Sequence, residues 1–178
     1  MLWNPLDRSH GNTIGKYVNM ADIILDKSDK ALSLVELMFF AYRDFVADPD
    51  HILDGLKFGR AHHRVLHFVG RNPGLTVAGL LDILQITKQS LARVLKELID
   101  QGYVFQREGA EDRRQRLLHL TPKGEALQAR LVASQINRFE KACKDIGATP
   151  EQFGRVLLAL VDEANQPLAL SLIKGHHG

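Results

Sequence analysis

Residues 76–102 read TVAGLLDILQITKQSLARVLKELIDQG. Thr76 and Thr87 are residues that favour helix N-caps, and Gly102 favours a helix C-terminus. Apolar residues at helical spacing follow each threonine: Val77, Leu80, Leu81 and Leu84 after the first, and Leu91, Val94, Leu95 and Leu98 after the second. Because only Gln85 and Ile86 separate the two patterns, the stretch predicts a helix-turn-helix.

The residues that follow predict a β-hairpin. Residues 103–108 and 115–120 are rich in aromatic and branched side chains, and a polar tip from Gly109 to Arg114 separates them. A hairpin directly after the second helix of a helix-turn-helix is a wing. We therefore expect a mainly α fold that contains a winged helix-turn-helix lobe with a small β-hairpin.

Longer helical patterns flank this lobe. Upstream, the sequence predicts a helix over residues 28–47, a turn at 48–50 and a second helix from about Ile52 to Arg71. Downstream, Thr121 and Pro122 begin a long helix that Gly147 ends. A capping box of Thr149 and Gln152 begins a last helix that continues to Pro167. The predicted division is 1–27, an unassigned extension; 28–50, an N-terminal dimerisation helix; 51–121, the winged lobe; and 122–178, C-terminal dimerisation helices and a tail.

The first helix and the last two helices carry apolar stripes that are wider than an ordinary amphipathic face. In a small protein, such stripes usually meet another chain, so we expect a homodimer. The alternative is that these stripes pack only on their own lobe.

The composition, 45% hydrophobic and 25% charged, is typical of a soluble globular protein. The longest apolar runs, such as 37–42 and 168–173, are far shorter than the roughly 20 residues that span a bilayer. The N-terminus lacks a secretory signal pattern. Cys143 is a single cysteine on an apolar stripe, which predicts a buried side chain rather than a redox sensor. We expect a cytoplasmic protein without membrane contact.

Positive charge concentrates in the middle of the chain. Residues 1–50 hold 5 basic and 8 acidic residues (−3), residues 51–130 hold 13 and 8 (+5), and residues 131–178 hold 5 and 5 (0). A local positive field is typical of a polyanion-binding module on a scaffold, and a merely solvated basic surface is the alternative.

The second helix of the helix-turn-helix offers polar side chains on the face that its aliphatic residues leave open. Gln89 and Arg93 lie one turn apart, and they have the hydrogen-bonding groups that read adenine and guanine. Lys88, Ser90 and Lys96 suit phosphate oxygens. An exposed polar face without a DNA partner is the alternative interpretation.

The wing tip adds three arginines at 113, 114 and 116, whose long side chains on a narrow element fit a minor groove. Phosphate would repel Asp112, so we expect it to orient a neighbouring arginine within the chain. The candidate DNA contacts are thus Thr76, Thr87, Lys88, Gln89, Ser90, Arg93, Lys96, Asp112, Arg113, Arg114 and Arg116.

The combination of these segments resembles the MarR family of bacterial regulators over roughly residues 30–165. The resemblance rests on LTVAGLL at 75–81, ITKQSLARVLKELIDQGYV at 86–104, DRR at 112–114 and LTPKG at 120–124. It implies a triangular homodimer that reads a palindromic operator in double-stranded DNA. It further implies that Arg93 is the recognition-helix arginine, that Asp112 braces the hairpin and that Arg114 enters the minor groove. Because the sequence shows no catalytic motif, we expect neither an enzyme nor a cofactor.

A regulator of this kind can respond to a small molecule. Phe39, Phe40 and Tyr42 offer aromatic surface on the first helix, and Arg60, His63 and His67 offer donors on the second. An aromatic carboxylate would satisfy both groups, and such effectors are common in the family that the chain resembles. The alternatives are that the aromatic residues are core, and that the protein is a constitutive or architectural DNA-binding factor without an effector.

The histidines at 62, 63 and 67 also invite a metal-dependent enzyme as an alternative. A zinc hydrolase of the His-Glu-x-x-His type needs a glutamate as general base, and Arg64 stands at that position. His176 and His177 lie in the terminal tail. We therefore name no metal site and no catalytic residue, and glycine-rich phosphate loops are also absent.

Overall fold

The computed structural model describes residues 30–110 and 112–174. The extension 1–27 and the tail histidines at 176 and 177 lie outside the described residues. The element order is α2 (Lys30–Asp54), α3 (Arg60–Arg71), β1 (Leu75–Thr76), α4 (Val77–Leu84), α5 (Lys88–Asp100), β2 (Val104–Glu108), β3 (Arg116–Leu120), α6 (Pro122–Ile146), α7 (Pro150–Ala159), the 3₁₀ turn η1 (Glu163–Asn165) and α8 (Gln166–Lys174).

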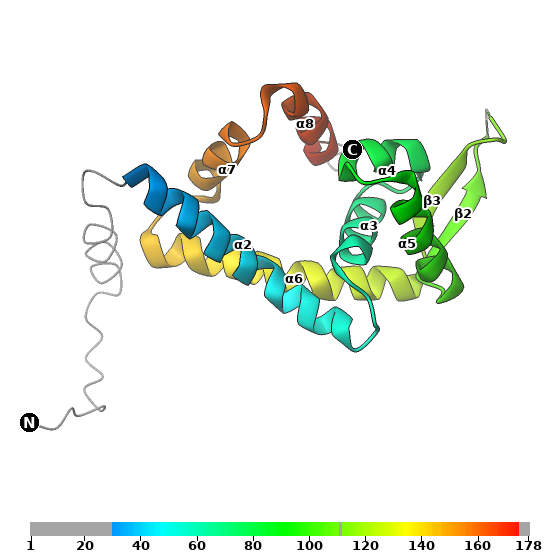
Figure 1. The fold of residues 1–178 in the computed structure, drawn as a ribbon, viewed down its shortest axis with the longest axis horizontal. Helices are drawn as coiled ribbons and strands as arrows, with labels where there is room; N and C mark the ends of the chain where they lie inside the picture. The colour runs from blue at the N-terminus through cyan, green and yellow to red at the C-terminus, as the bar shows by residue number, and fades with distance from the viewer. Residues whose placement is uncertain (1–29, 111, 175–178) are drawn as a thin grey trace, which may run out of the picture.

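These elements form two regions (Figure 1). The winged lobe consists of α3, α4, α5 and the three strands, and its hairpin projects outward. The terminal helices are α2, α6, α7 and α8, of which α2 and α6 pack along each other. From the far end of α6 the chain turns back through α7 and η1, so that α8 comes to lie near the lobe.

The sheet of the winged lobe is antiparallel, with strand order β1-β3-β2. The hairpin register pairs Val104 with Leu120 and Glu108 with Arg116, which confirms the predicted wing. Strand β1, which pairs Leu75 with Leu118, was not predicted, because a two-residue strand is too short to show an alternating pattern.

The core of the molecule lies inside the winged lobe. The apolar positions predicted for the helix-turn-helix point inward, and Leu80, Leu91 and Leu98 are fully buried together with Leu118 of the wing. Leu127 and Leu131, in the N-terminal half of α6, belong to the same core. The two predicted N-caps are also confirmed, because the Thr76 hydroxyl accepts a hydrogen bond from Gly79 N–H and the Thr87 hydroxyl accepts one from Ser90 N–H.

The first turn of α6 packs so closely against the chain at Tyr103 that it requires a glycine at position 124. The Thr121 hydroxyl caps the helix by accepting from Gly124 N–H at 3.1 Å. A β-carbon at position 124 would lie 2.1 Å from the carbonyl oxygen of Tyr103. Only glycine therefore allows α6 to begin directly against the strand that starts the wing.

The predicted boundary between the first two helices is wrong. Helix α2 continues through Pro49 to Asp54, and α3 begins only at Arg60. Pro49 is fully buried, so packing compensates for the hydrogen bond that its missing N–H removes. The chain instead turns over residues 55–59, where Lys57 has a φ of 57° and the carbonyl of Leu53 accepts from the N–H groups of Leu56 and Phe58.

The predicted last helix is also wrong, since it consists of two helices. Helix α7 ends at Ala159, and α8 begins at Gln166 with Pro167 in its first turn, where a proline needs no hydrogen-bond partner. The side-chain amide of Gln166 donates to the carbonyls of Leu158 and Val161 and so satisfies groups that the end of α7 leaves open.

In the described part of the chain, no single helix has the length and apolarity to cross a membrane. By length and composition alone, α7 together with the segment Glu163–Ile173 passes that test as a pair bent by 116°.

Candidate nucleic-acid interface

Two hydrogen bonds fix the turn between α4 and α5, one from Gln85 and one from Arg64. Gln85 adopts the left-handed conformation, with a φ of 50°, and its N–H donates to Leu81 O. Arg64 on α3 donates from its guanidinium to the carbonyl of Leu84 at 3.1 Å. A cation at the C-terminus of α4 is also favoured by the helix dipole. Arg64 therefore connects α3 to the point where the chain turns toward α5.

Helix α5 separates an apolar face from a polar face. Leu91, Val94, Leu95 and Leu98 are buried, whereas the predicted contacts at Lys88, Gln89, Ser90, Arg93 and Lys96 are all exposed. The Thr87 and Ser90 hydroxyls are hydrogen-bonded to each other at 2.8 Å within the N-cap. Thr76 is half-buried, and its hydroxyl is engaged in the cap of α4.

The cations of α5 differ in their partners. Lys96 forms an ion pair with Asp100 one turn later, and that carboxylate raises the pKa of Lys96 through the hydrogen bond and its charge. No hydrogen bond or ion pair within the described residues involves the side chain of Arg93. The guanidinium of Arg93 is thus an exposed donor without a partner among the residues that the structure describes.

The wing tip is a tight turn built on Asp112. The Asp112 carboxylate accepts from Arg114 N–H at 2.9 Å, and its backbone carbonyl accepts from Gln115 N–H at 3.0 Å. A β-carbon on Gly109 would lie 2.7 Å from that carbonyl oxygen. Asp112 therefore holds the backbone of the turn, and the interaction expected with a neighbouring arginine is made with the N–H of Arg114.

The three wing arginines are exposed but not equivalent. Arg116 forms an ion pair with Glu108 on the opposite strand at 2.9 Å. The guanidiniums of Arg113 and Arg114 make no hydrogen bond or ion pair with any described residue. The tip therefore presents two cations that are unpaired with respect to the described residues, and a third, Arg116, that must leave Glu108 to bind a new partner.

The structure brings Tyr42 and Arg60 together but places Phe39 and His67 elsewhere. The guanidinium carbon of Arg60 lies 6.0 Å from the ring centroid of Tyr42. The same guanidinium forms an ion pair with Asp50 at 2.9 Å, so the carboxylate compensates its charge. Phe39 is 71% exposed. His63 is buried at the junction with the terminal helices, where burial lowers its pKa against the opposing effects of Asp50 and Gln135.

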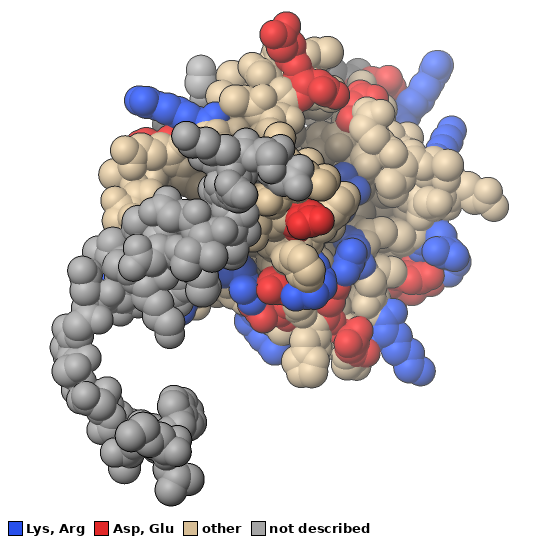
Figure 2. All heavy atoms as spheres, turned by 60° about the vertical axis from the view of Figure 1, so that its left-hand side comes forward, with Lys and Arg blue, Asp and Glu red and all other residues tan. Residues whose placement is uncertain are grey.

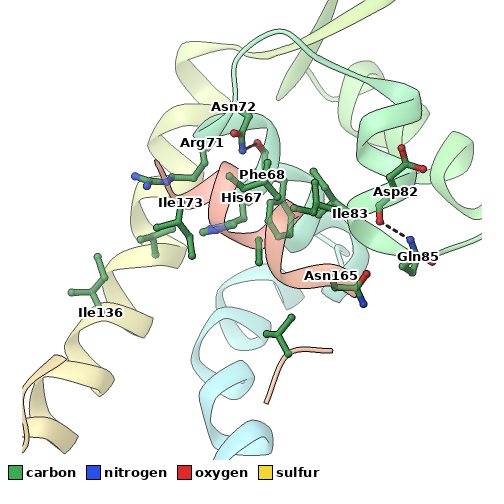
Figure 3. A pocket seen from close by; sticks show the side chains of 15 residues that line it. His67, Phe68, Arg71, Asn72, Asp82, Ile83, Gln85, Ile136, Asn165 and Ile173 are labelled. Atoms are coloured by element: carbon green, nitrogen blue, oxygen red, sulfur yellow. Dashed lines mark hydrogen bonds between the residues drawn. The ribbon is translucent and has the colours of Figure 1, made fainter. Parts of the chain in front are cut away.

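His67 instead lines a pocket of about 630 Å³ between the winged lobe and the terminal helices (Figure 3). His67, Phe68, Arg71 and Asn72 come from α3, and Asp82 and Ile83 come from α4. Ile136 of α6 and the apolar side chains of α8 close the other side. The sequence predicted an effector site between the first and second helices but missed the contribution of α8, because it ended the last helix at Pro167.

The three histidines of α3 do not converge. Within residues 30–110 and 112–174, no group of three His, Cys, Asp or Glu side chains is placed to hold a metal ion. His62 stacks on Phe58 and contacts Glu97 of α5, a pairing that sequence spacing did not predict because the two residues lie 35 positions apart. Cys143 is half-buried between α6 and α7.

The winged lobe and its wing match a known family. Residues 56–115 match the model of the MarR family. Over 131 residues, 73% of this chain and 79% of the relative, the chain is 51% identical to the HTH-type transcriptional regulator PetP of Rhodobacter capsulatus. The chain belongs to the MarR family of transcriptional regulators.

Solved structures of MarR-family regulators share the fold. A MarR family transcription regulator superposes with a TM-score of 0.62 at 23% identity, over 75% of this chain and 89% of the other. FabT of Streptococcus pneumoniae, solved in complex with DNA, gives a TM-score of 0.62 at 20% identity, over 81% of this chain and 99% of the other. These likenesses extend beyond the lobe to the terminal helices of the mainly α architecture.

Proposed function

We propose that this MarR-family regulator binds a palindromic operator in duplex DNA as a homodimer, with α5 in the major groove and the wing in the adjacent minor groove. The observation that carries the proposal is the row of exposed cations on α5 and the wing tip of one lobe, most of which have no partner within residues 30–110 and 112–174. An unpaired cation can bind phosphate or a base edge without first giving up a protein partner. The complex of FabT with DNA supports the same use of this fold.

The partners of each side chain suggest a division of roles. Arg93 has no partner in the described part of the chain and, with Gln89 one turn before it, suits direct contact with base edges. Lys88, Ser90 and Lys96 suit the phosphate backbone, and Thr87 caps the first turn, from which Lys88 and Ser90 project. Arg113 and Arg114 suit the minor groove. Arg116 gives up an exposed ion pair worth only about 0–1 kcal/mol when it turns to phosphate.

Homodimerisation is supported by the apolar surface that the terminal helices leave uncovered. Among the described residues, the exposed large hydrophobic side chains all lie within residues 32–42 and 136–173, and α7 has no buried residue. Figure 2 turns this end of the molecule toward the viewer, and uncharged side chains lie among charged ones on the part of the surface that the view shows. A second copy that contributes the same helices would cover these faces and place two winged lobes about one axis.

Selection of bound fragments from genomic DNA tests the proposed function. We expect the protein to retain fragments that share a palindromic motif, and an Arg93→Ala, Arg114→Ala double variant to retain none of them preferentially. A selected pool without any shared motif, or equal enrichment by the double variant, would contradict it. Circular dichroism of the double variant controls for folding.

A response to a small anionic ligand is a second proposal, favoured by the pocket around His67. Its lining is mostly apolar, Arg71 supplies a cation, and Asn72 and Asn165 supply amide groups at its edge (Figure 3). A ligand held between the lobe and α8 would favour one arrangement of the two regions over others, which is how a ligand couples to DNA binding. An aromatic carboxylate matches this combination of groups.

Calorimetric titration with a panel of aromatic carboxylates tests the second proposal. We expect Arg71→Ala to weaken binding about ten-fold, the loss of one charge-assisted hydrogen bond. The matched control is Arg60→Ala, because Arg60 lies outside the pocket and is already paired with Asp50. Equal affinity in the wild type and Arg71→Ala, or no binding by any member of the panel, would remove the pocket from consideration.

A further inference from the structure

We infer that His62 is a positioning residue for DNA recognition, because it holds the carboxylate of Glu97 away from Arg93. The inference rests on the proposed role of Arg93 at base edges. It concerns three side chains: His62 on α3, and Arg93 and Glu97, which stand one turn apart on α5.

The hydrogen bonds of His62 fix the direction of its ring. Its Nδ1 accepts from the backbone N–H of Gly59 at 3.1 Å, so the neutral imidazole carries its hydrogen on Nε2. That Nε2 lies 2.7 Å from Oε2 of Glu97 and donates to it. Phe58 stacks on the imidazole at 4.5 Å between ring centroids and in turn contacts Tyr103 edge-on at 5.3 Å. His62 is only 8% exposed, so these contacts fix the position of its Nε2 donor.

Glu97 is the acid best placed to compete for Arg93. Side chains at i and i+4 of a helix are neighbours, and oppositely charged pairs at that spacing attract each other. The other acid near the end of α5, Asp100, is already paired with Lys96. With Glu97 bonded to His62 and Asp100 bonded to Lys96, Arg93 keeps no acidic partner among the described side chains and stays available to a base edge.

Without the imidazole as its hydrogen-bond donor, the Glu97 carboxylate would be free to pair with Arg93 and would compete with the DNA for that guanidinium. An arginine that precedes its glutamate forms the weaker orientation of such a pair, so the effect for each subunit is modest. In a dimer both recognition helices are affected, and we expect an operator affinity about three- to five-fold lower.

Substitutions at 62 and 97 separate this role from a purely structural one. The test uses His62→Phe, which keeps a buried ring on Phe58 but removes the donor, and His62→Gln, whose amide can still donate to Glu97. Affinity for a selected operator is measured for each variant, for Glu97→Ala and for the double variant His62→Phe, Glu97→Ala. Thermal melting of each variant confirms that it is folded.

The expected pattern is a loss in His62→Phe, near wild-type affinity in His62→Gln, and recovery of most of the loss in the double variant. A double variant as weak as His62→Phe, or a His62→Phe variant equal to the wild type, would overturn the inference while leaving the proposed function intact. Failure of the wild type to bind any selected operator would instead contradict the proposed function. In an Arg93→Ala background, His62→Phe should have no further effect on the preference for operator over random duplex, and a persistent effect would also overturn the inference.

Discussion

The winged lobe buries most of its apolar side chains, whereas the terminal helices leave many of theirs exposed. In the lobe, leucines and valines from α3, α4, α5 and the wing are nearly all buried against one another. On the terminal helices, residues of the same chemistry stand exposed, and α7 buries none of its own. Since exposed apolar patches of this extent mark interaction sites, the lobe is complete within one chain whereas the terminal helices are not.

This difference divides the work between the two regions. A lobe whose core is closed can hold α5 and the wing tip in fixed positions, which recognition of base edges requires. Our proposal is that the terminal helices obtain a partner from a second copy, which sets the spacing between two lobes. Substitutions in the winged lobe and on the terminal helices test this difference.

The largest effect is expected when an alanine replaces a helical glycine in the lobe junction. Gly124→Ala brings a β-carbon onto the carbonyl of Tyr103 and should reduce the free energy of unfolding by about 3 kcal/mol. The matched control is Gly154→Ala on α7, where nothing lies within 4 Å and a change of less than about 1 kcal/mol is expected. Chemical denaturation measures both, and equal losses would contradict the contrast between the regions.

The next effect concerns assembly. Leu157→Glu on the exposed stripe of α7 should raise the dissociation constant of the proposed dimer about 30-fold, or about 2 kcal/mol, because the charge would have to be buried in the seam. Arg155→Glu, an exposed change off the stripe of the same helix, is the control and should leave assembly unchanged. Light scattering over a dilution series gives the result, and indistinguishable curves for the two variants would place the seam elsewhere.

A comparable effect is expected on DNA specificity. Arg93→Ala should cost about 1–3 kcal/mol at one base pair in each half-site, since it removes a contact to a base edge. Lys96→Ala should weaken all sequences about equally, because a phosphate contact carries no sequence information. Binding to a randomised operator library separates the two, and an identical uniform loss in both variants would remove the distinction between Arg93 and Lys96.

The smallest effect is expected on the pH dependence of stability, at His63, which is buried where the winged lobe meets the terminal helices. Burial lowers the pKa of His63 from its ordinary value of 6.5, so the unfolded chain takes up a proton at a pH at which the folded chain does not. Stability should therefore fall as the pH drops from about 6.5 toward the lower folded-state pKa, and it should stop falling below that value. His63→Gln should flatten this part of the pH profile in denaturant titrations, with the exposed His51→Gln as control. An unchanged slope in His63→Gln would show that another group causes it.

Local signals predicted the lobe well and the connections between helices poorly. Thr76, Thr87 and Thr121 act as caps through their own hydroxyls, so neighbouring residues were enough to place α4, α5 and α6. Pro49 suggested a helix end, but its burial in the packed α2 outweighs its missing hydrogen bond. Gly55 and Gly59 flank the true turn and could have located it.

The candidate site shows the same limit. The exposed face of α5 follows directly from helical spacing and was predicted with every side chain on the correct face. The contacts from Arg64 to Leu84 and from His62 to Glu97 join residues 20 and 35 positions apart, so no local pattern could find them. The pocket around His67 escaped full prediction because it depends on where α8 packs.

Sedimentation velocity with a labelled duplex that carries a selected palindromic operator tests the central claim most directly. If the terminal helices pair two complete lobes, the wild type should form a complex of two chains per duplex. Leu157→Glu should bind the same duplex with much lower affinity although its lobe is intact. A wild-type complex of one chain per duplex, with the affinity unchanged by Leu157→Glu, would contradict the account.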